Sequence, residues 1–274
     1  MLKVNNRMAS YGVTSQNESV TGLECSIESL ARLGYVIIDS GYNEEEILNI
    51  QKSFGEVRSN YNKFHDLELL ERKDEHNGIR LPLLLSQTFL DLAFNDNVIE
   101  LIRGLMGHNF ILNQQNGVIN PAKKTYNQSA WHRDLPYQHY TSSKPLALNA
   151  LYCVDDFTIE NGGTKVIPSS HLHENFPSEN YIEHNSIQVS AKAGSFIVLD
   201  CMLYHAGSVN NSKFERRAVN HVFSSPMIKQ QIEFSNKSLE HYSLTSEQKK
   251  ILGLNYNTLK SVSDYIKSRP EKND

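Results

Sequence analysis

A series of short apolar segments separated by turn residues runs through this chain from residue 109 to residue 224. Many short strands with turn chemistry between them are typical of a jelly roll or a barrel. The sequence therefore predicts a mainly β core with flanking helices. We expect strands at 109–113, from 117, through His132, and at 146–154, 164–167, 187–191, 194–204 and 216–224.

Helical patterns flank this β region on both sides. Residues 25–33 carry apolar side chains at helical spacing, and a second helix begins after Asn43 with three glutamates in its first turn. Residues 86–106 predict one or two helices that break near 95–97, and residues 226–274 return to helix. The long polar stretch 57–85 is interpreted as a lid.

Size and composition fit a single domain. The chain has 274 residues, of which 39% are hydrophobic and 21% charged, which is enough for one substantial core. Residues 1–20 are rich in Asn and Ser and are predicted to be a flexible lead-in. We therefore expect one domain over 21–274, with a β core at about 109–225 and a helical C-terminal extension at about 226–274.

Charge and cysteine content exclude several classes of protein. The net charge is −4 without a strongly basic stretch, so a nucleic-acid partner is not expected. No apolar run reaches the roughly 18–20 residues that span a bilayer, and the first residues lack a signal-peptide core. Three widely spaced cysteines argue against a disulfide framework or a zinc ribbon. We expect a cytoplasmic protein, of unknown oligomeric state, without a membrane partner.

The pair His132 and Asp134 is the strongest chemical signal. In an extended strand, residues two apart project from the same face, roughly 6–7 Å apart. A second histidine converging on them would complete the two-His, one-carboxylate triad that non-haem iron oxygenases use. His205 lies 73 residues later, after the apolar run 196–199 and before a polar turn. This position, at a strand end, favours His205 as the third ligand.

Other histidines and two arginines leave alternatives open. His171 and His173 also form a His-x-His pair, but the neighbouring Pro and Ser residues place them in a loop. Arg216 and Arg217 are consecutive in a predicted strand, so only one of them can face the interior. A guanidinium facing inward would suit a dicarboxylate co-substrate. The strand pattern alone favours neither arginine.

Three motifs in this chain together resemble the phytanoyl-CoA dioxygenase family. They are Trp131–Tyr137, Glu160–His171 and Gly194–Asp200, and the last leads to His205 and Arg216. The resemblance covers about residues 30–225. It implies a double-stranded β-helix that uses Fe(II), O2 and 2-oxoglutarate and releases succinate and CO2. By position it implies His132, Asp134 and His205 as iron ligands and catalytic residues, and Arg216 as the arginine that binds 2-oxoglutarate.

The resemblance gives further residues a role but does not specify a substrate. Beside Arg216, we expect Ser208, Asn149 and Asn113 to contact the co-substrate. Many relatives carry Trp at the position of Leu151, so the pocket is expected to be roomier here. Tyr137, His139 and Gln115 are predicted to contact a small polar metabolite rather than a long acyl chain. Ascorbate is the reductant expected to support activity in vitro.

Three functional hypotheses follow. The first is an Fe(II)- and 2-oxoglutarate-dependent dioxygenase that hydroxylates a small-molecule substrate in a biosynthetic pathway, although desaturation, cyclisation and epimerisation use the same triad. The second is a cupin-like metal enzyme that does not use 2-oxoglutarate and would not need Arg216. The third is a non-catalytic ligand-binding jelly roll, which would tolerate the loss of His132.

Overall fold

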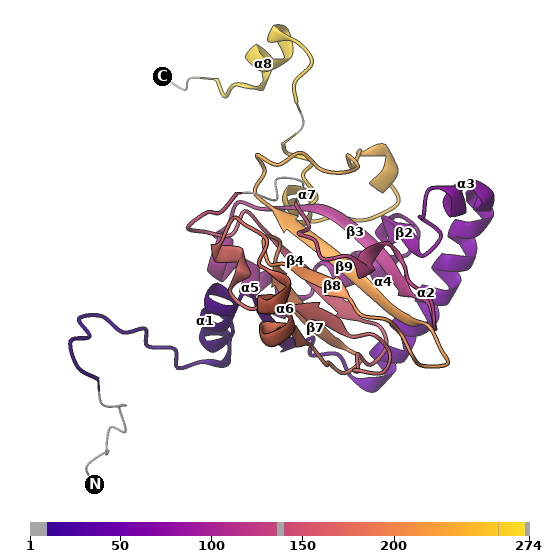
Figure 1. Cartoon of the computed structure of the whole chain (residues 1–274). Helices are drawn as coiled ribbons and strands as arrows, with labels where there is room; N and C mark the ends of the chain where they lie inside the picture. The colour runs from indigo at the N-terminus through magenta and orange to yellow at the C-terminus, as the bar shows by residue number, and fades with distance from the viewer. Residues whose placement is uncertain (1–9, 136–139, 257, 272–274) are drawn as a thin grey trace.

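Two antiparallel sheets form the core of the protein. The computed structural model describes residues 10–135, 140–256 and 258–271, and Figure 1 shows its course. The larger sheet has the strand order β1-β7-β4-β9-β3-β2 and the smaller one β6-β5-β8. The larger sheet comprises Tyr35–Asp39 (β1), Ser195–Asp200 (β7), Ala147–Cys153 (β4), Arg216–Ser224 (β9), Ile111–Asn120 (β3) and Gly78–Arg80 (β2). The smaller sheet comprises Ile187–Gln188 (β6), Thr164–Val166 (β5) and His205–Gly207 (β8).

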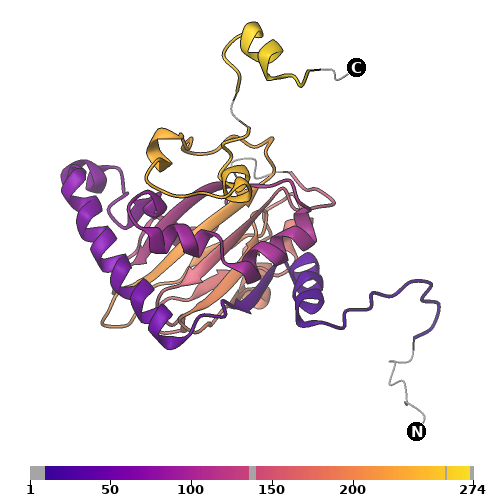
Figure 2. The same ribbon diagram turned by 180° about the vertical axis from the view of Figure 1, so that it is seen from behind.

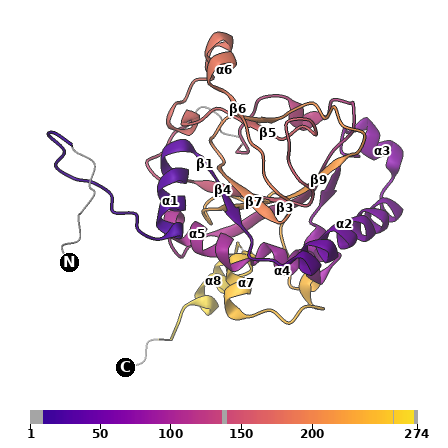
Figure 3. The ribbon, with the colours of Figure 1, turned by 90° about the horizontal axis from the view of Figure 1, so that it is seen from below.

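Helices cover one face of the larger sheet, and the smaller sheet lies on the other side (Figures 2 and 3). The covering helices are Gly22–Leu33 (α1), Glu44–Phe64 (α2), Gln87–Ala93 (α4) and Asp96–Met106 (α5). Their apolar side chains, such as Phe54 and Phe89, pack with Phe196 and Phe223 of the sheet in one buried cluster. Burial of this apolar surface is the main force that holds the helical layer to the sheet. The other face of the sheet is left for the interior of the jelly roll.

The helix boundaries follow the capping signals in the sequence. Thr21 and Asn43 each form a capping box with the glutamate three residues later, at the starts of α1 and α2. The Asn95 side chain accepts from the backbone N–H of Val98 at the start of α5, and Gly107 ends that helix with a φ of 75°. The predicted break near 95–97 is therefore confirmed.

Three expectations about the elements were wrong. Residues 57–85 are not a long polar loop, because α2 continues to Phe64 and is followed by Leu67–Arg72 (α3), β2 and Pro82–Leu84 (η1). The separate strands expected at 109–113 and from 117 form the single strand β3, which a bulge after Leu112 interrupts. His132 does not lie in a regular strand but in an isolated bridge to His205.

The remaining elements are short. They are Asn127–Ser129 (η2), Ser170–Leu172 (η3), Glu179–Asn185 (α6), Lys237–Leu239 (η4), Ser246–Ile251 (α7) and Val262–Ser268 (α8). Helix α7 begins with the Thr245 cap, while α8 stands away from the body (Figure 1). In the described residues after 226, three short helical pieces are joined by longer irregular segments. Among the described residues, no helix is long and apolar enough to cross a bilayer.

Strand β9 divides its side chains between the two faces of the larger sheet. Val219 and Phe223 belong to the cluster under the helices, whereas Ala218 and Val222 pack on the jelly-roll side. This alternation has a period of two, as strand geometry requires. His221 shares the parity of Val219 and is buried on the helical side, where its ring contacts that of Phe196.

We predict that His221 makes stability depend on pH. Burial lowers the pKa of His221 from 6.5 to about 4, against the opposing effect of its hydrogen bonds to backbone. Between these values only the unfolded chain is protonated, so the stabilisation is complete above pH 6.5 and is lost as the pH falls towards 4. Urea unfolding at several pH values should show a steeper decline for the wild type than for His221→Asn, by up to about 1.4 kcal/mol per pH unit. Equal slopes would contradict this assignment.

Candidate active site

The backbone brings His132, Asp134 and His205 together. His132 and His205 exchange two backbone hydrogen bonds of 3.0 Å, and the Asp134 N–H donates to the carbonyl of Cys201 at 3.0 Å. Asp134 Oδ1 lies 3.9 Å from His132 Nε2 and 3.5 Å from His205 Nε2. One ligand atom from each residue lies within 4.8 Å of the others, which is compatible with a shared metal ion.

Backbone carbonyls orient both imidazoles. The Nδ1 atom of His132 lies 2.8 Å from the carbonyl oxygen of Ala130, and that of His205 lies 3.0 Å from the carbonyl oxygen of Leu203. Each Nδ1–H therefore donates to backbone, which leaves Nε2 as the metal-binding atom. The Nε2 atom of His132 is buried without a hydrogen-bond partner among the described residues. A divalent cation would satisfy this orphaned lone pair.

Asn149 fixes the carboxylate of the triad. Its Nδ2 donates to Asp134 Oδ2 at 2.8 Å, while the other carboxylate oxygen, Oδ1, faces the two histidines. A carboxylate held in this way by a neighbouring amide is the usual arrangement around a metal ligand. Asn149, which was expected to contact the co-substrate, thus positions Asp134.

Burial and the mutual charges of the three groups shift their pKa values. Burial raises the pKa of Asp134, but the charge and hydrogen bond of His205, followed by His132 and Asn149, outweigh burial and lower this pKa to about 2. Burial lowers the pKa of His205, but the Asp134 carboxylate more than compensates and the net shift is upward. Burial and the neighbouring His205 lower the pKa of His132.

Arg216 lies in the same cavity as the triad. This inner cavity is lined by all three triad residues together with Tyr126, Arg216 and others. The Arg216 guanidinium donates to the Tyr126 hydroxyl at 3.4 Å and the Gly162 carbonyl at 3.2 Å, and it stacks 3.9 Å from the Phe157 ring centroid. It is only 2% exposed, and its Nε lacks a hydrogen-bond partner within the described chain.

Among the described residues, no carboxylate pairs with the buried charge of Arg216. Burying a charge without a partner is costly. Arg217 differs, because it points to the other face and forms a two-point ion pair with Asp155. Only Arg216 is thus available to an anion bound in the cavity.

Two other predicted contacts lie away from the cavities. The amide of Asn113 donates to Ser224 Oγ and to the carbonyl of Lys229, so it anchors the segment after β9. Gln115 is fully buried on the helical side, where it accepts from the Leu83 N–H and donates to the Phe89 carbonyl. Neither side chain is brought to the triad, because both are engaged with backbone elsewhere.

The remaining predicted residues are placed as follows. The hydroxyl oxygen of Ser208 is buried without a hydrogen-bond partner in the described residues, and Ser208 itself follows strand β8 directly. Leu151 lines the inner cavity. His171 is buried at α1, where its Nε2 lies 3.2 Å from the Ala31 carbonyl oxygen, and is not part of the triad. Tyr137 and His139 fall outside the described residues.

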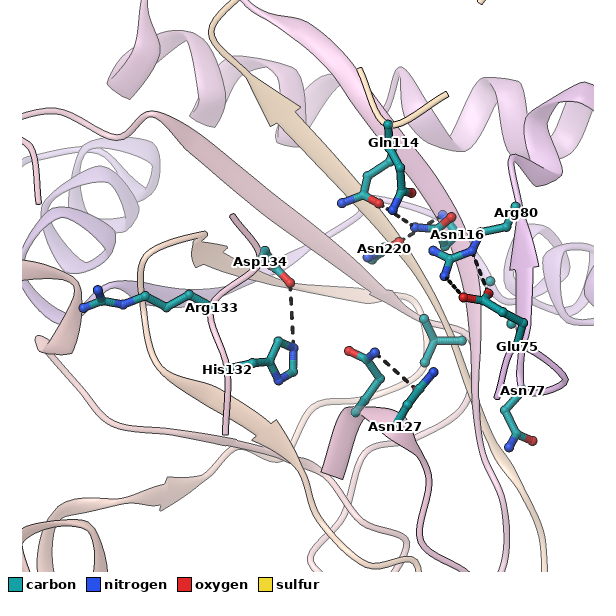
Figure 4. A pocket seen from close by; sticks show the side chains of 15 residues that line it. Glu75, Asn77, Arg80, Gln114, Asn116, Asn127, His132, Arg133, Asp134 and Asn220 are labelled. Atoms are coloured by element: carbon teal, nitrogen blue, oxygen red, sulfur yellow. Dashed lines mark hydrogen bonds and ion pairs between the residues drawn. The ribbon is translucent and has the colours of Figure 1, made fainter. Parts of the chain in front are cut away.

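A second cavity opens beside the first. It has a volume of about 230 Å³ and shares Val118, Gln128, His132, Asp134 and Asn220 with the inner cavity. Figure 4 shows the side chains that line this outer cavity. Sequence reasoning did not assign Tyr126, Thr164, Asn116 or the pair Glu75 and Arg80 to the site. For Asn220 a signal existed, because it has the same strand parity as Arg216.

A jelly roll whose interior combines this triad with a buried arginine is the architecture of an Fe(II)- and 2-oxoglutarate-dependent oxygenase. The chain belongs to the phytanoyl-CoA dioxygenase family, whose family model, described as Phytanoyl-CoA dioxygenase (PhyH), matches residues 30–218. The predicted double-stranded β-helix and the family are thereby confirmed. The family and the triad together imply iron and 2-oxoglutarate.

Relatives with similar sequences include an uncharacterized protein of Mycobacterium tuberculosis. It is 28% identical over 222 residues, which cover 79% of this chain and 81% of that protein. Ectoine dioxygenase of Sphingopyxis alaskensis is 22% identical over 216 residues, covering 68% and 70% of the two chains.

Two solved structures share the fold. The iron-bound structure of EctD from S. alaskensis has a TM-score of 0.62 at 19% identity and covers 84% of this chain and 87% of that one. The non-heme α-ketoglutarate-dependent epimerase SnoN, from nogalamycin biosynthesis, has a TM-score of 0.58 at 19% identity and covers 74% and 83%. At 19% identity, the likeness to these two structures shows a shared fold alone.

We predict that Asn149→Leu weakens metal binding. Without the amide, Asp134 loses the hydrogen bond that fixes its orientation, and the loss of such a partner typically costs about 10–100-fold in metal affinity. Titration with Mn(II), followed by electron paramagnetic resonance, measures the effect. The exposed Asn180 provides a matched control as Asn180→Leu, which should bind Mn(II) like the wild type. An unchanged affinity in Asn149→Leu would show that Asp134 does not need this amide.

Proposed function

We propose that this oxygenase hydroxylates a small polar metabolite in a biosynthetic pathway and uses 2-oxoglutarate as its co-substrate. The observation that carries the proposal is that the triad and an unpaired, buried arginine line one cavity. In the reaction, one oxygen atom of O2 enters a C–H bond of the substrate as a hydroxyl. The other enters succinate as 2-oxoglutarate loses CO2.

The residues of this chain would divide the work between metal and co-substrate. His132, Asp134 and His205 would hold Fe(II) on one side, and Fe(II) would supply the activation of O2. Arg216 would bind the far carboxylate of 2-oxoglutarate with charge-assisted hydrogen bonds. The Tyr126 hydroxyl, 3.4 Å from the Arg216 guanidinium, would complete this end of the site. Ascorbate would serve as the reductant in vitro.

The retained carboxylate supports hydroxylation. In related halogenases a small residue replaces the carboxylate of the triad so that a halide can bind, whereas Asp134 is present here and oriented by Asn149. A cupin-like enzyme that does not use 2-oxoglutarate would have no co-substrate carboxylate to neutralise the buried charge of Arg216. A non-catalytic jelly roll would not need the orphaned Nε2 of His132.

We predict that Asp134→Ala abolishes turnover. Mutation of a residue that only hydrogen-bonds to a metal ligand typically lowers metal affinity or activity about 10–100-fold. Removal of a ligand itself should therefore reduce succinate release more than about 100-fold. The assay contains Fe(II), ascorbate and 2-oxoglutarate, and it detects uncoupled turnover before the substrate is known. Circular dichroism should show a folded variant. Succinate release at the wild-type rate would refute the assignment of the triad.

A second prediction separates the two consecutive arginines. Arg216→Ala should raise the Kd for 2-oxoglutarate about 10–100-fold, because it removes charge-assisted hydrogen bonds worth about 1.5–3 kcal/mol. Arg217→Ala is the matched control, since it removes the same charge from the other face and loses the Asp155 ion pair and a hydrogen bond to the Gln51 carbonyl. Calorimetric titration of the Zn(II)-loaded variants measures both, with melting temperatures as a check on folding. Equal effects would contradict the role of Arg216.

A further inference from the structure

The outer cavity has an unusual chemical character. Of its fifteen lining residues only Val118, Gly78 and Gly117 are apolar, whereas ligand pockets are ordinarily lined mainly by apolar and aromatic side chains. Seven of the lining residues carry amides, namely Asn77, Gln114, Asn116, Asn127, Gln128, Asn220 and Gln231. An amide both donates and accepts hydrogen bonds without carrying charge. A ligand here would be held by hydrogen bonds rather than by apolar contact.

The charged residues around this cavity are already matched. Arg80 and Glu75 form a two-point ion pair, with distances of 2.9 Å from Nε and 2.6 Å from Nη2 (Figure 4). The Arg133 side chain points away from the cavity, donates to the Ser170 carbonyl at 2.9 Å and lies 4.0 Å from the Tyr204 ring centroid.

A carboxylate or phosphate ligand would require an uncommitted cation, and an ammonium ligand would require an uncommitted carboxylate. Asp134 is engaged with the two triad histidines and Asn149. In the described part of the lining, neither kind of free charge is present. The cavity therefore favours a ligand that is polar and uncharged.

Besides His132 Nε2, the lining contains a buried acceptor on Asn116 that has no partner among the described residues. Asn116 is 5% exposed, and its Nδ2 donates to Gln114 Oε1 at 3.0 Å, but its Oδ1 has no hydrogen-bond partner among the described residues. A buried acceptor left unsatisfied costs about 1–3 kcal/mol. A hydroxyl or N–H group of a ligand would remove this cost.

The unsatisfied group lies on strand β3, which is paired with β9 beside the triad. Asn116 and Asn220 are directly opposite one another on β3 and β9, and the Asn116 backbone N–H donates to Asn220 Oδ1 at 2.9 Å. Asn220 also lines the inner cavity with His132 and Asp134. A ligand bound to these asparagines would therefore sit next to the metal-binding residues.

We infer that the outer cavity binds the substrate and selects a neutral, hydroxyl-rich ring, such as a monosaccharide, a glycoside or a cyclitol. The inference rests on the proposed function and deepens it. Hydroxyl groups match the amides because both donate and accept. The volume of about 230 Å³ lies below the range of about 300–1,000 Å³ found for drug-sized ligands, which fits one ring. A long acyl chain would leave the amides unpaired.

Ligand binding can be tested apart from turnover. The probes are the methyl glycosides of glucose, galactose and mannose, together with myo-inositol, glucuronate, glucosamine and octanoyl-CoA. Saturation-transfer NMR with protein loaded with Zn(II) and 2-oxoglutarate detects each complex. We expect binding of at least one neutral ring and none of octanoyl-CoA. Preference for a charged probe, or binding of no neutral ring, would overturn the inference.

Substitutions locate the binding site. Asn116→Leu and Asn220→Leu should each lower the affinity for the neutral ring about tenfold or more, because a hydroxyl group of the ligand is then buried without a partner. Asn180→Leu should leave this affinity unchanged. Asn116→Asp keeps the side-chain shape and adds a free carboxylate, so it should shift preference towards glucosamine. Unchanged affinities in all three pocket variants would overturn the inference.

Uncoupled succinate release without any sugar tests the proposed oxygenase function separately from the inferred substrate class. If wild-type protein releases succinate but binds only charged probes, the substrate class is wrong while the proposed function stands. If it releases no succinate, the proposed function itself fails.

Discussion

Two backbone hydrogen bonds between His132 and His205 hold the site together. They join segments 73 residues apart in the chain and place the two imidazoles side by side, with ring centroids 4.3 Å apart. Asp134 follows two residues after His132, and its N–H is fixed on the Cys201 carbonyl. The metal-binding geometry is therefore set by backbone pairing, and the side chains need only local hydrogen bonds to be oriented.

Strand β9 links this site to the rest of the fold. One face of the strand carries Arg216 and Asn220 into the two cavities, and the other contributes Val219 and Phe223 to the core under the helices. A shift of one residue in the register would exchange these sets. Pairing with β3 and β4 on either side makes such a shift costly. The helical layer thus stabilises the site through the strand rather than by touching it.

Much of this arrangement could be predicted from the sequence, because it rests on local signals. Caps at Asn43 and Thr245 and the glycine at 107 mark helix ends by backbone chemistry. His132 and Asp134 were recognisable by their spacing and His205 by its position at the end of an apolar strand, and the resemblance to a family supported all three. The choice of Arg216 over Arg217 came from that resemblance, since strand parity allows either arginine to face inward.

Other features depend on tertiary packing and gave no local signal. Gln115 looks like a polar pocket residue in the sequence, but the η1 and α4 backbones next to it engage its amide. The bulge after Leu112 disturbs the strand alternation of β3, so the facing of Asn113 could not be read from parity. Tyr126 reaches Arg216 from a segment without regular structure, and Glu75 and Arg80 become pocket residues only when β2 pairs with β3.

In the proposed function, a single cavity would hold Fe(II) at the triad and the far carboxylate of 2-oxoglutarate at Arg216. The most direct measurement is an anaerobic titration of the Fe(II)-loaded protein with 2-oxoglutarate, followed by visible absorption. We expect a saturable charge-transfer band from 2-oxoglutarate chelated to ferrous iron, with one co-substrate bound per chain. Absence of the band, while Fe(II) and 2-oxoglutarate each bind, would show that they occupy separate places and would refute a shared cavity.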